Sequence, residues 1–185
     1  MGEPRIDGPD LMLRELSGGT TPAQASGFFD SLPPVRVQEL TGSWQGAEVP
    51  TSHPLDGVLT RLGWYGKQFD GPDDAHPLLF AGGDGGPFDV NPWFVPLGTV
   101  LRLGPLLRQP AAGRALRPLL QLVRTRKPRA RLRMVEYRGV LSAAMVYDSQ
   151  PIIDSFRRVS GNTLLGAMDY RGPQGPFMFT LRRSG

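Results

Sequence analysis

The last third of the chain alternates short strand-like runs with turn residues, and this pattern constrains the fold more than any other feature. Gly139, Pro151, Gly161 and Gly172 fall between the runs, where turn residues belong. A strand about every ten residues is typical of an antiparallel meander or barrel. We therefore predict a mainly β fold of the β-rich α+β class, an antiparallel β-barrel with accessory helices. The predicted strands cover 131–138, 140–147, 152–159, 163–170 and 177–183.

The rest of the chain divides by composition. Residues 1–19 are polar and rich in glycine and proline, which predicts a flexible arm. Thr21 followed by Pro22 is a typical helix start, and this helix should end before Pro33. Residues 20–90 form the region that contains the opening strand. Residues 91–128 form a basic and partly helical connecting segment, and residues 129–185 complete the same barrel.

Composition excludes several classes of site. The chain has no cysteine, so it holds no disulfide, thiolate metal site or cysteine nucleophile. No window approaches the ~18 unbroken apolar residues of a membrane span, and the acidic N-terminal residues do not fit a secretory signal. We therefore expect a cytoplasmic protein, peripheral at the inner membrane face if its charge directs it there. No nucleotide-binding or hydrolase motif is present.

Charge is distributed very unevenly. Residues 1–89 contain five Lys or Arg and 13 Asp or Glu, whereas residues 90–185 contain 16 and four. The stretch 90–135 has ten basic residues and no acidic one. Such a run attracts anionic partners, and the alternative is that it pairs with the acidic half of the chain. Nucleic acid is the least favoured partner, because no aromatic residues are interleaved for base stacking.

Residues 113–127 predict a basic amphipathic helix. Leucines and a valine recur there at helical spacing, and arginines occupy the other positions, as in helices that lie in a membrane interface. Pro118 opposes this, because a proline inside a helix costs about 3 kcal/mol. The alternative is a helix that covers the open side of the barrel. The candidate membrane-contact residues are Arg114, Arg117, Arg124, Arg126 and Lys127.

Two histidines, His53 and His76, are the candidates for acid–base chemistry. Each precedes a proline, which favours extended or turn backbone. Asp56 lies three residues after His53, where a carboxylate orients an imidazole, so this pair is the candidate general base. The alternative for both histidines is ordinary packing in a loop. Their spacing fits no zinc site, and we predict no metal and no cofactor.

Aromatic residues surround Lys67, one of only two lysines. A lysine buried there binds an anionic ligand head or loses its proton, and the alternative is that it reaches solvent. Asp148, Asp154 and Asp169 lie at or near predicted strand ends, where hydrogen bonds in turns explain them. The candidate ligand-binding residues are Trp44, His53, Trp64, Tyr65, Lys67 and Phe69.

The run Gly42-Ser43-Trp44-Gln45-Gly46 resembles the motif of the GXWXG family. The C-terminal part resembles the domain of unknown function 4334 that accompanies this motif. The two resemblances cover roughly residues 25–80 and 129–183, and they imply no settled activity. The matching segments are 50–57, 63–67 and 76–78 in the first part and 137–139, 144–148, 151–154, 165–169 and 179–183 in the second.

The chain is more loosely similar to calycin-type barrels such as lipocalins and nitrobindin-like proteins, in which a Gly-x-Trp opens the first strand. This resemblance implies a calycin-like or related β-barrel. It also implies that Arg182 packs across Trp44 by a cation–π contact and closes the barrel bottom. Nitrobindin-like haem binding needs a histidine near the C-terminal strands, and none follows His76, so haem is not expected.

Together these patterns predict a non-enzymatic protein that binds a hydrophobic or lipid-like small molecule and turns a basic face toward anionic membranes. The alternative is a small hydrolase- or isomerase-type enzyme, in which His53 oriented by Asp56 is the general base. A third reading is a structural protein whose basic segment docks on an acidic partner.

Overall fold

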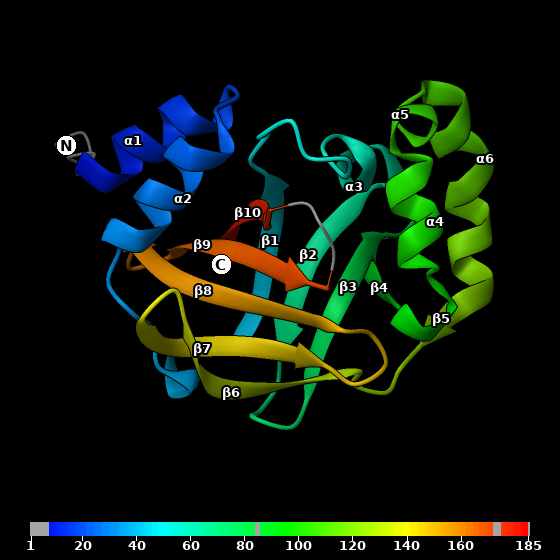
Figure 1. Cartoon of the computed structure of the whole chain (residues 1–185). Coiled ribbons are helices and arrows are strands. Elements are labelled where there is room, and N and C mark those ends of the chain that lie inside the picture. Colours follow the sequence, from blue (N-terminus) through cyan, green and yellow to red (C-terminus); the bar gives the residue numbers. More distant parts are fainter. Residues whose placement is uncertain (1–7, 84–85, 172–174, 185) are drawn as a thin grey trace, which may run out of the picture.

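A computed structural model describes residues 8–83, 86–171 and 175–184, and a curved antiparallel sheet forms its centre (Figure 1). The main strands are β1 (Gly42–Glu48), β2 (Trp64–Phe69), β3 (Ala75–Ala81), β6 (Ala130–Tyr137), β7 (Val140–Tyr147), β8 (Ile152–Ser160), β9 (Thr163–Tyr170) and β10 (Phe177–Arg183). The last five begin and end within one residue of the predicted bounds.

The sheet closes on itself as a barrel. Its order is β2-β1-β10-β9-β8-β7-β6-β3, and β3 pairs back onto β2. Every neighbouring pair is antiparallel. The predicted mainly β fold, an antiparallel barrel with accessory helices, is therefore confirmed. In this circular order β2 and β8 stand opposite each other.

Short elements surround the barrel. The helices are α1 (Gly8–Ser17), α2 (Pro22–Ser31), α3 (Val58–Leu62), α4 (Leu97–Arg102), α5 (Gly104–Leu107) and α6 (Pro110–Leu120). Three 3-10 turns are η1 (Val37–Glu39), η2 (Pro92–Phe94) and η3 (Gln121–Val123), and two short strands are β4 (Pro87–Val90) and β5 (Arg124–Thr125). Each helix in the described ranges falls short of the length and apolarity needed to cross a bilayer.

The helices α1 and α2 cover the outside of one barrel wall (Figure 1). β9 is therefore buried on both faces, whereas the first residues of β6 alternate between buried and exposed because water meets their outer face. A second apolar cluster fills the space under these helices. Its members are Leu13, Leu16, Ala25, Phe29, Leu32, Val49, Val159, Leu165, Ala167 and Met178.

The N-terminal prediction needs one correction. Within the expected arm 1–19, Gly8–Ser17 form α1, which buries Leu13 and Leu16 against the second cluster. Residues 1–7 of the expected arm lie outside the described part of the chain. The predicted start of the next helix is confirmed, because Thr21 and Gln24 form a reciprocal capping box and Pro22 follows the cap.

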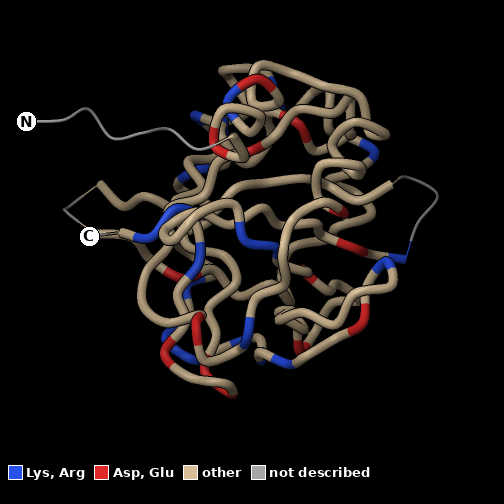
Figure 2. The backbone as a smooth tube through the Cα atoms, turned by 90° about the vertical axis from the view of Figure 1, so that its left-hand side faces the viewer, with Lys and Arg blue, Asp and Glu red and all other residues tan. Residues whose placement is uncertain are grey.

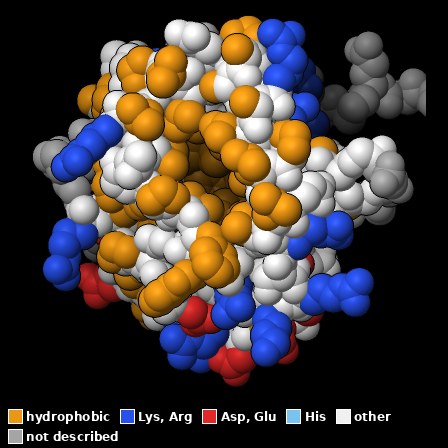
Figure 3. Space-filling view, turned by 90° about the vertical axis from the view of Figure 1, so that its right-hand side faces the viewer, with side chains coloured by type: hydrophobic (Ala, Val, Ile, Leu, Met, Phe, Trp, Pro, Cys, Tyr) orange, Lys and Arg blue, Asp and Glu red, His pale blue; other side chains and the backbone are white. Residues whose placement is uncertain are grey.

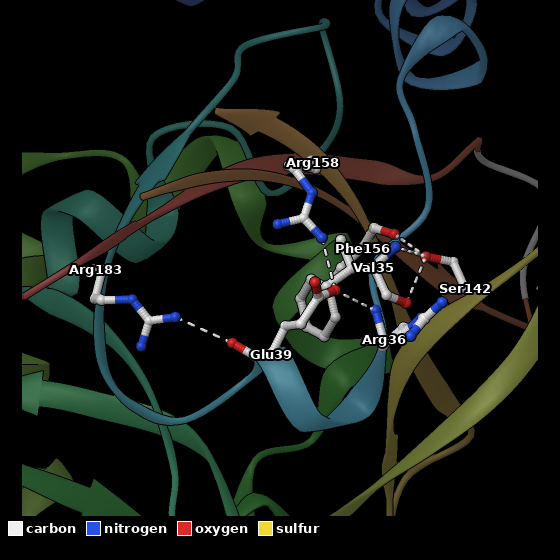
Figure 4. A network of polar contacts seen from close by, with 7 residues as sticks. All are labelled: Val35, Arg36, Glu39, Ser142, Phe156, Arg158 and Arg183. Atoms are coloured by element: carbon white, nitrogen blue, oxygen red, sulfur yellow. Dashed lines mark hydrogen bonds and ion pairs between the residues drawn. The ribbon is translucent and has the colours of Figure 1, made fainter. Parts of the chain in front are cut away.

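Residues 33–41 close one end of the barrel (Figure 4). The Val35 amide donates to Ser142 Oγ at 2.9 Å, which ties this segment to β7. The Glu39 carboxylate accepts from Arg158 Nη2 of β8 at 2.6 Å, and its backbone carbonyl accepts from Arg183 Nη2 of β10 at 3.0 Å. Three strands thus hold this segment in place at one end of the barrel.

At the other end the barrel wall divides. β3 pairs with β6 at a single position, Ala75 with Ala130, and farther along the same strand Leu79–Ala81 pair with β4 instead. β4 in turn pairs with β5. The connection η2–α4–α5–α6 leaves from β4 and returns at β5, so this helical segment flanks the divided wall on the right of Figure 1.

An irregularity in β2 sets which side chains point inward. The pairing of β2 with β3 shifts register on both sides of Gly66, so Trp64, Lys67 and Phe69 are all buried although strict alternation would separate them. Gly66 has φ +147°, and a Cβ there would lie 1.9 Å from the Trp44 carbonyl oxygen. Only glycine fits this position, and the bulge turns Lys67 into the barrel.

We predict that Gly66→Ala lowers the free energy of unfolding by more than about 2 kcal/mol, because the added Cβ meets backbone at a φ that L residues avoid. Gly27→Ala in α2 is the matched control. It places a Cβ in open space on a helix and should be neutral or stabilising. Urea unfolding of both variants measures the difference. Equal stability of the two variants would show that the bulge does not require glycine at position 66.

Candidate ligand-binding cavity

The barrel contains a cavity that opens between its divided wall and the helical segment. Its volume is about 100 Å³. Figure 3 shows hydrophobic side chains around a deep hollow on this side of the molecule. The apolar lining residues are Leu55, Val58, Leu59, Leu62, Trp64, Leu78, Phe80, Pro92, Val95, Leu97, Val100, Leu120, Ile152, Met168, Phe177 and Phe179.

Two glycines leave room for the aromatic walls of this cavity. A Cβ on Gly46 would lie 2.3 Å from the Trp64 ring, and a Cβ on Gly166 would lie 2.3 Å from the Phe179 ring. The two rings meet edge to face at 5.8 Å. The second glycine of the motif around Trp44 thus lets the Trp64 ring approach the backbone of β1 closely.

A buried ion pair forms the polar part of the cavity. Lys67 Nζ lies 2.8 Å from Asp154 Oδ2, and both side chains line the cavity. The same ammonium donates to the Pro77 carbonyl at 3.1 Å and to the Tyr147 hydroxyl at 3.4 Å. Because Lys67 belongs to β2 and Asp154 to β8, the pair joins opposite walls of the barrel. The Lys67 side chain is 3% exposed and that of Asp154 is 1% exposed.

Burial dominates the protonation of this pair. It lowers the pKa of the Lys67 amine, against the attraction of the Asp154 carboxylate. It also raises the pKa of the Asp154 carboxyl, against the attraction of Lys67, and raises the pKa of the Tyr147 hydroxyl well above its usual value. With the proton on either partner, Lys67 and Asp154 together carry no net charge. The polar end of the cavity is therefore dipolar and neutral.

Two of the predicted ligand-binding residues, Trp64 and Lys67, line the cavity. The other four do not. Trp44 and Phe69 are buried in the main core cluster, and Tyr65 points outward, where its hydroxyl lies 3.2 Å from Ser184 Oγ. His53 is buried behind the lining, with its ring 5.5 Å from that of Phe177. The alternative in which Lys67 reaches solvent is excluded by its burial.

The geometry around His53 and Asp56 differs from that of an oriented base. Asp56 Oδ2 accepts from the backbone amides of Thr51 and His53, both at 2.8 Å, and His53 Nδ1 accepts from the Leu55 amide at 3.1 Å. Burial lowers the pKa of the His53 imidazole. These bonds fold the loop that precedes α3. A catalytic role for the pair remains a prediction.

The arginine that packs on Trp44 is Arg183 rather than Arg182. Its guanidinium carbon lies 4.3 Å from the Trp44 ring centroid. Trp44 pairs with Arg183 across β1 and β10, so the two side chains share the inner face, whereas Arg182 pairs with Gln45. The predicted cation–π contact at the barrel bottom is therefore correct in kind and wrong by one residue.

Several apolar side chains next in sequence to the cavity lining are exposed. Trp93 is 68% exposed and Leu122 is 80% exposed, and Phe94 and Leu119 are also exposed. They neighbour the lining residues Pro92, Val95 and Leu120 in sequence. We call Trp93, Phe94, Leu119 and Leu122 the mouth rim. Gln150 fixes one side of the mouth, because its Nε2 donates to the carbonyls of Pro92 and Val95.

The predicted amphipathic helix is shorter than 113–127. α6 ends at Leu120, two residues after Pro118, and Arg124 begins β5. Leu120 and Val123 pack against the barrel cluster, as expected for a helix that covers the open side. Leu119 remains exposed. One side of the segment therefore covers the barrel, as the second alternative has it, and contact of the segment with a membrane stays a prediction.

Most basic residues of 90–135 form no ion pair with a described acidic residue, although Arg108 and Arg117 donate to backbone carbonyls. Arg131 and Arg133 form ion pairs with Asp148 and Asp73. Among the described residues, no acidic group pairs with the others, which are Arg102, Arg108, Arg114, Arg117, Arg124, Arg126, Lys127 and Arg129. Figure 2 shows acidic and basic residues interspersed along the backbone.

Sequence reasoning missed three polar residues of the cavity, together with most of its apolar lining. Asp154 was expected at a turn but lies inside β8, and Tyr147 and Gln150 were not singled out. The sequence did contain a signal for Asp154. This residue follows Ile152-Ile153 inside a strand-like run, and a turn residue that points outward is not expected inside such a run. In the described part of the chain, no three His, Asp or Glu side chains cluster as metal ligands.

We predict that Lys67→Met lowers the free energy of unfolding by about 3 kcal/mol at pH 7, because it leaves a buried carboxylate unpaired. The loss should shrink as the pH falls, since burial raises the pKa of Asp154 and a protonated Asp154 needs no cation. The double variant Lys67→Met/Asp154→Leu should lie within about 1 kcal/mol of wild type. Urea unfolding from pH 7 to pH 4 tests this, and a single variant as stable as the double at pH 7 would refute it.

Comparisons with known proteins match the two parts of the chain separately. Residues 27–85 match the profile of the GXWXG proteins, and residues 128–183 match that of a domain of unknown function, DUF4334. A crystal structure described as that of a protein from Thermomonospora curvata superposes with a TM-score of 0.70 at 30% sequence identity. The match covers 96% of this chain and 98% of that one. No match was found among functionally curated proteins.

Proposed function

The chain belongs to the GXWXG proteins that carry a DUF4334 domain, and we propose that it binds an apolar small molecule inside its barrel. The observation that carries this proposal is the cavity, whose lining is apolar apart from Lys67, Asp154, Gln150 and the Tyr147 hydroxyl. Sites for small molecules combine such walls with a few fixed polar groups. The volume of the cavity suits a small single-chain molecule better than a two-chain phospholipid.

We further propose that the ligand enters from an anionic membrane surface. The mouth rim exposes aromatic and aliphatic side chains, and the helical segment and the residues that follow β5 carry cations that pair with no described acidic group. Proteins that bind in the membrane interface combine these two features. Charge complementarity favours an anionic lipid surface over a neutral one, and the open hollow faces the same side (Figure 3).

A residue that fills the cavity should abolish binding. Val100 lines the cavity and is half-buried, so Val100→Trp places an indole where the ligand would lie. We expect at least a tenfold weaker affinity for N-phenyl-1-naphthylamine, a neutral apolar dye whose fluorescence rises on burial. Leu141→Trp on β7 is the control, because that side chain is exposed and does not line the cavity. Equal dye affinity in the two variants would contradict the proposal.

Membrane contact should depend on charge at the mouth side. Each Lys or Arg near an anionic surface contributes about 1 kcal/mol at low salt. We therefore expect Arg126→Gln/Lys127→Gln to weaken flotation with phosphatidylglycerol vesicles about 30-fold, and Leu122→Ser to weaken it without changing the salt dependence.

Arg14→Gln on α1 is the control for this experiment, because α1 lies across the molecule from the helical segment (Figure 1). It should float as wild type does. Equal binding of the wild type to phosphatidylglycerol and phosphatidylcholine vesicles would exclude an anionic surface as the source of the ligand, while leaving the cavity itself untouched.

A further inference from the structure

The polar groups of the cavity are incompletely paired within the protein. Asp154 Oδ2 accepts from Lys67, and the Tyr147 hydroxyl lies close enough to the Asp154 carboxyl to lower its pKa. Asp154 Oδ1 is nevertheless buried without a hydrogen bond of good geometry to any described residue. The Nε1–H of Trp64, another lining residue, is also buried without a partner in the described ranges. An unpaired carboxylate oxygen in an apolar interior is costly and calls for a partner.

We infer that the ligand is a neutral apolar alcohol whose hydroxyl group donates to Asp154 Oδ1. The inference rests on the proposed function and names its ligand class. A hydroxyl supplies the donor that the carboxylate oxygen lacks, and it can also accept a hydrogen bond, as the Trp64 indole requires. The hydrocarbon part then lies along the apolar walls toward the mouth.

The charges of the site argue against other head groups. Asp154 already neutralises Lys67 at 2.8 Å, so the cavity holds no spare cation for a fatty-acid carboxylate. A carboxylate near Oδ1 would face a like charge. An ammonium would add a net charge to an apolar interior whose ion pair is already balanced, and burying that charge is expensive. An ether accepts hydrogen bonds but donates none, so it leaves Oδ1 unpaired.

A matched ligand series tests the inference. 1-Octanol, 1-methoxyheptane, nonane, octanoic acid and octylamine differ little in size and compete for the cavity against N-phenyl-1-naphthylamine at pH 7. We expect 1-octanol to displace the dye at a concentration about tenfold or more below that of the ether and of nonane, because these leave the carboxylate oxygen unpaired. The acid and the amine should also be weaker than the alcohol.

Two double variants locate the preference. Lys67→Met/Asp154→Leu removes the ion pair and with it the Oδ1 acceptor, so it should lose the preference for the alcohol over the ether while it still binds the dye. Arg131→Met/Asp148→Leu removes an ion pair of the same kind from the surface and should keep the wild-type preference. Circular dichroism and the urea midpoint establish that both variants are folded.

Each outcome decides between the two proposals. If alcohol and ether bind equally to the wild type, if the acid or amine binds tightest, or if Lys67→Met/Asp154→Leu keeps the preference, the alcohol inference is wrong and the binding function stands. If neither the dye nor any of the five ligands binds to folded wild-type protein, the proposed function itself fails.

Discussion

The ion pair between Lys67 and Asp154 is the interaction on which the interior of this barrel depends. It joins strands that stand opposite each other in the closed sheet, and it does so in an apolar space where either charge alone would be unfavourable. A barrel core filled only with apolar side chains would be at least as stable by this measure. The interior is therefore not optimised for packing at the ion pair, and the cavity lies beside this pair.

Small residues and a bulge make this arrangement geometrically possible. The Gly66 bulge turns Lys67 inward, Gly46 and Gly166 let aromatic rings approach the strand backbone closely, and the single pairing of β3 with β6 opens the wall. The motif around Trp44 serves both ends of the barrel. Trp44 itself stacks on Arg183 at the closed end, and Gly46 supports the Trp64 wall of the cavity.

The five C-terminal strands could be predicted to within a residue because their turns are marked by glycine and proline and their spacing is regular. The cavity residues were harder, because contacts such as that between Lys67 and Asp154 join positions 87 residues apart. The Gly66 bulge also breaks the alternation from which burial is predicted. Arg183 was missed by one position for a related reason, since the register between β1 and β10 is not visible in either strand alone.

The central claim is that the barrel is hollow beside its buried ion pair, and diffraction from crystals held under xenon pressure tests it most directly. Xenon enters apolar cavities and scatters strongly. We predict a xenon peak within the barrel, in contact with Phe80 and Ile152, which line the cavity. A barrel interior without such a peak, with the lining side chains packed against one another across the space, would contradict the account.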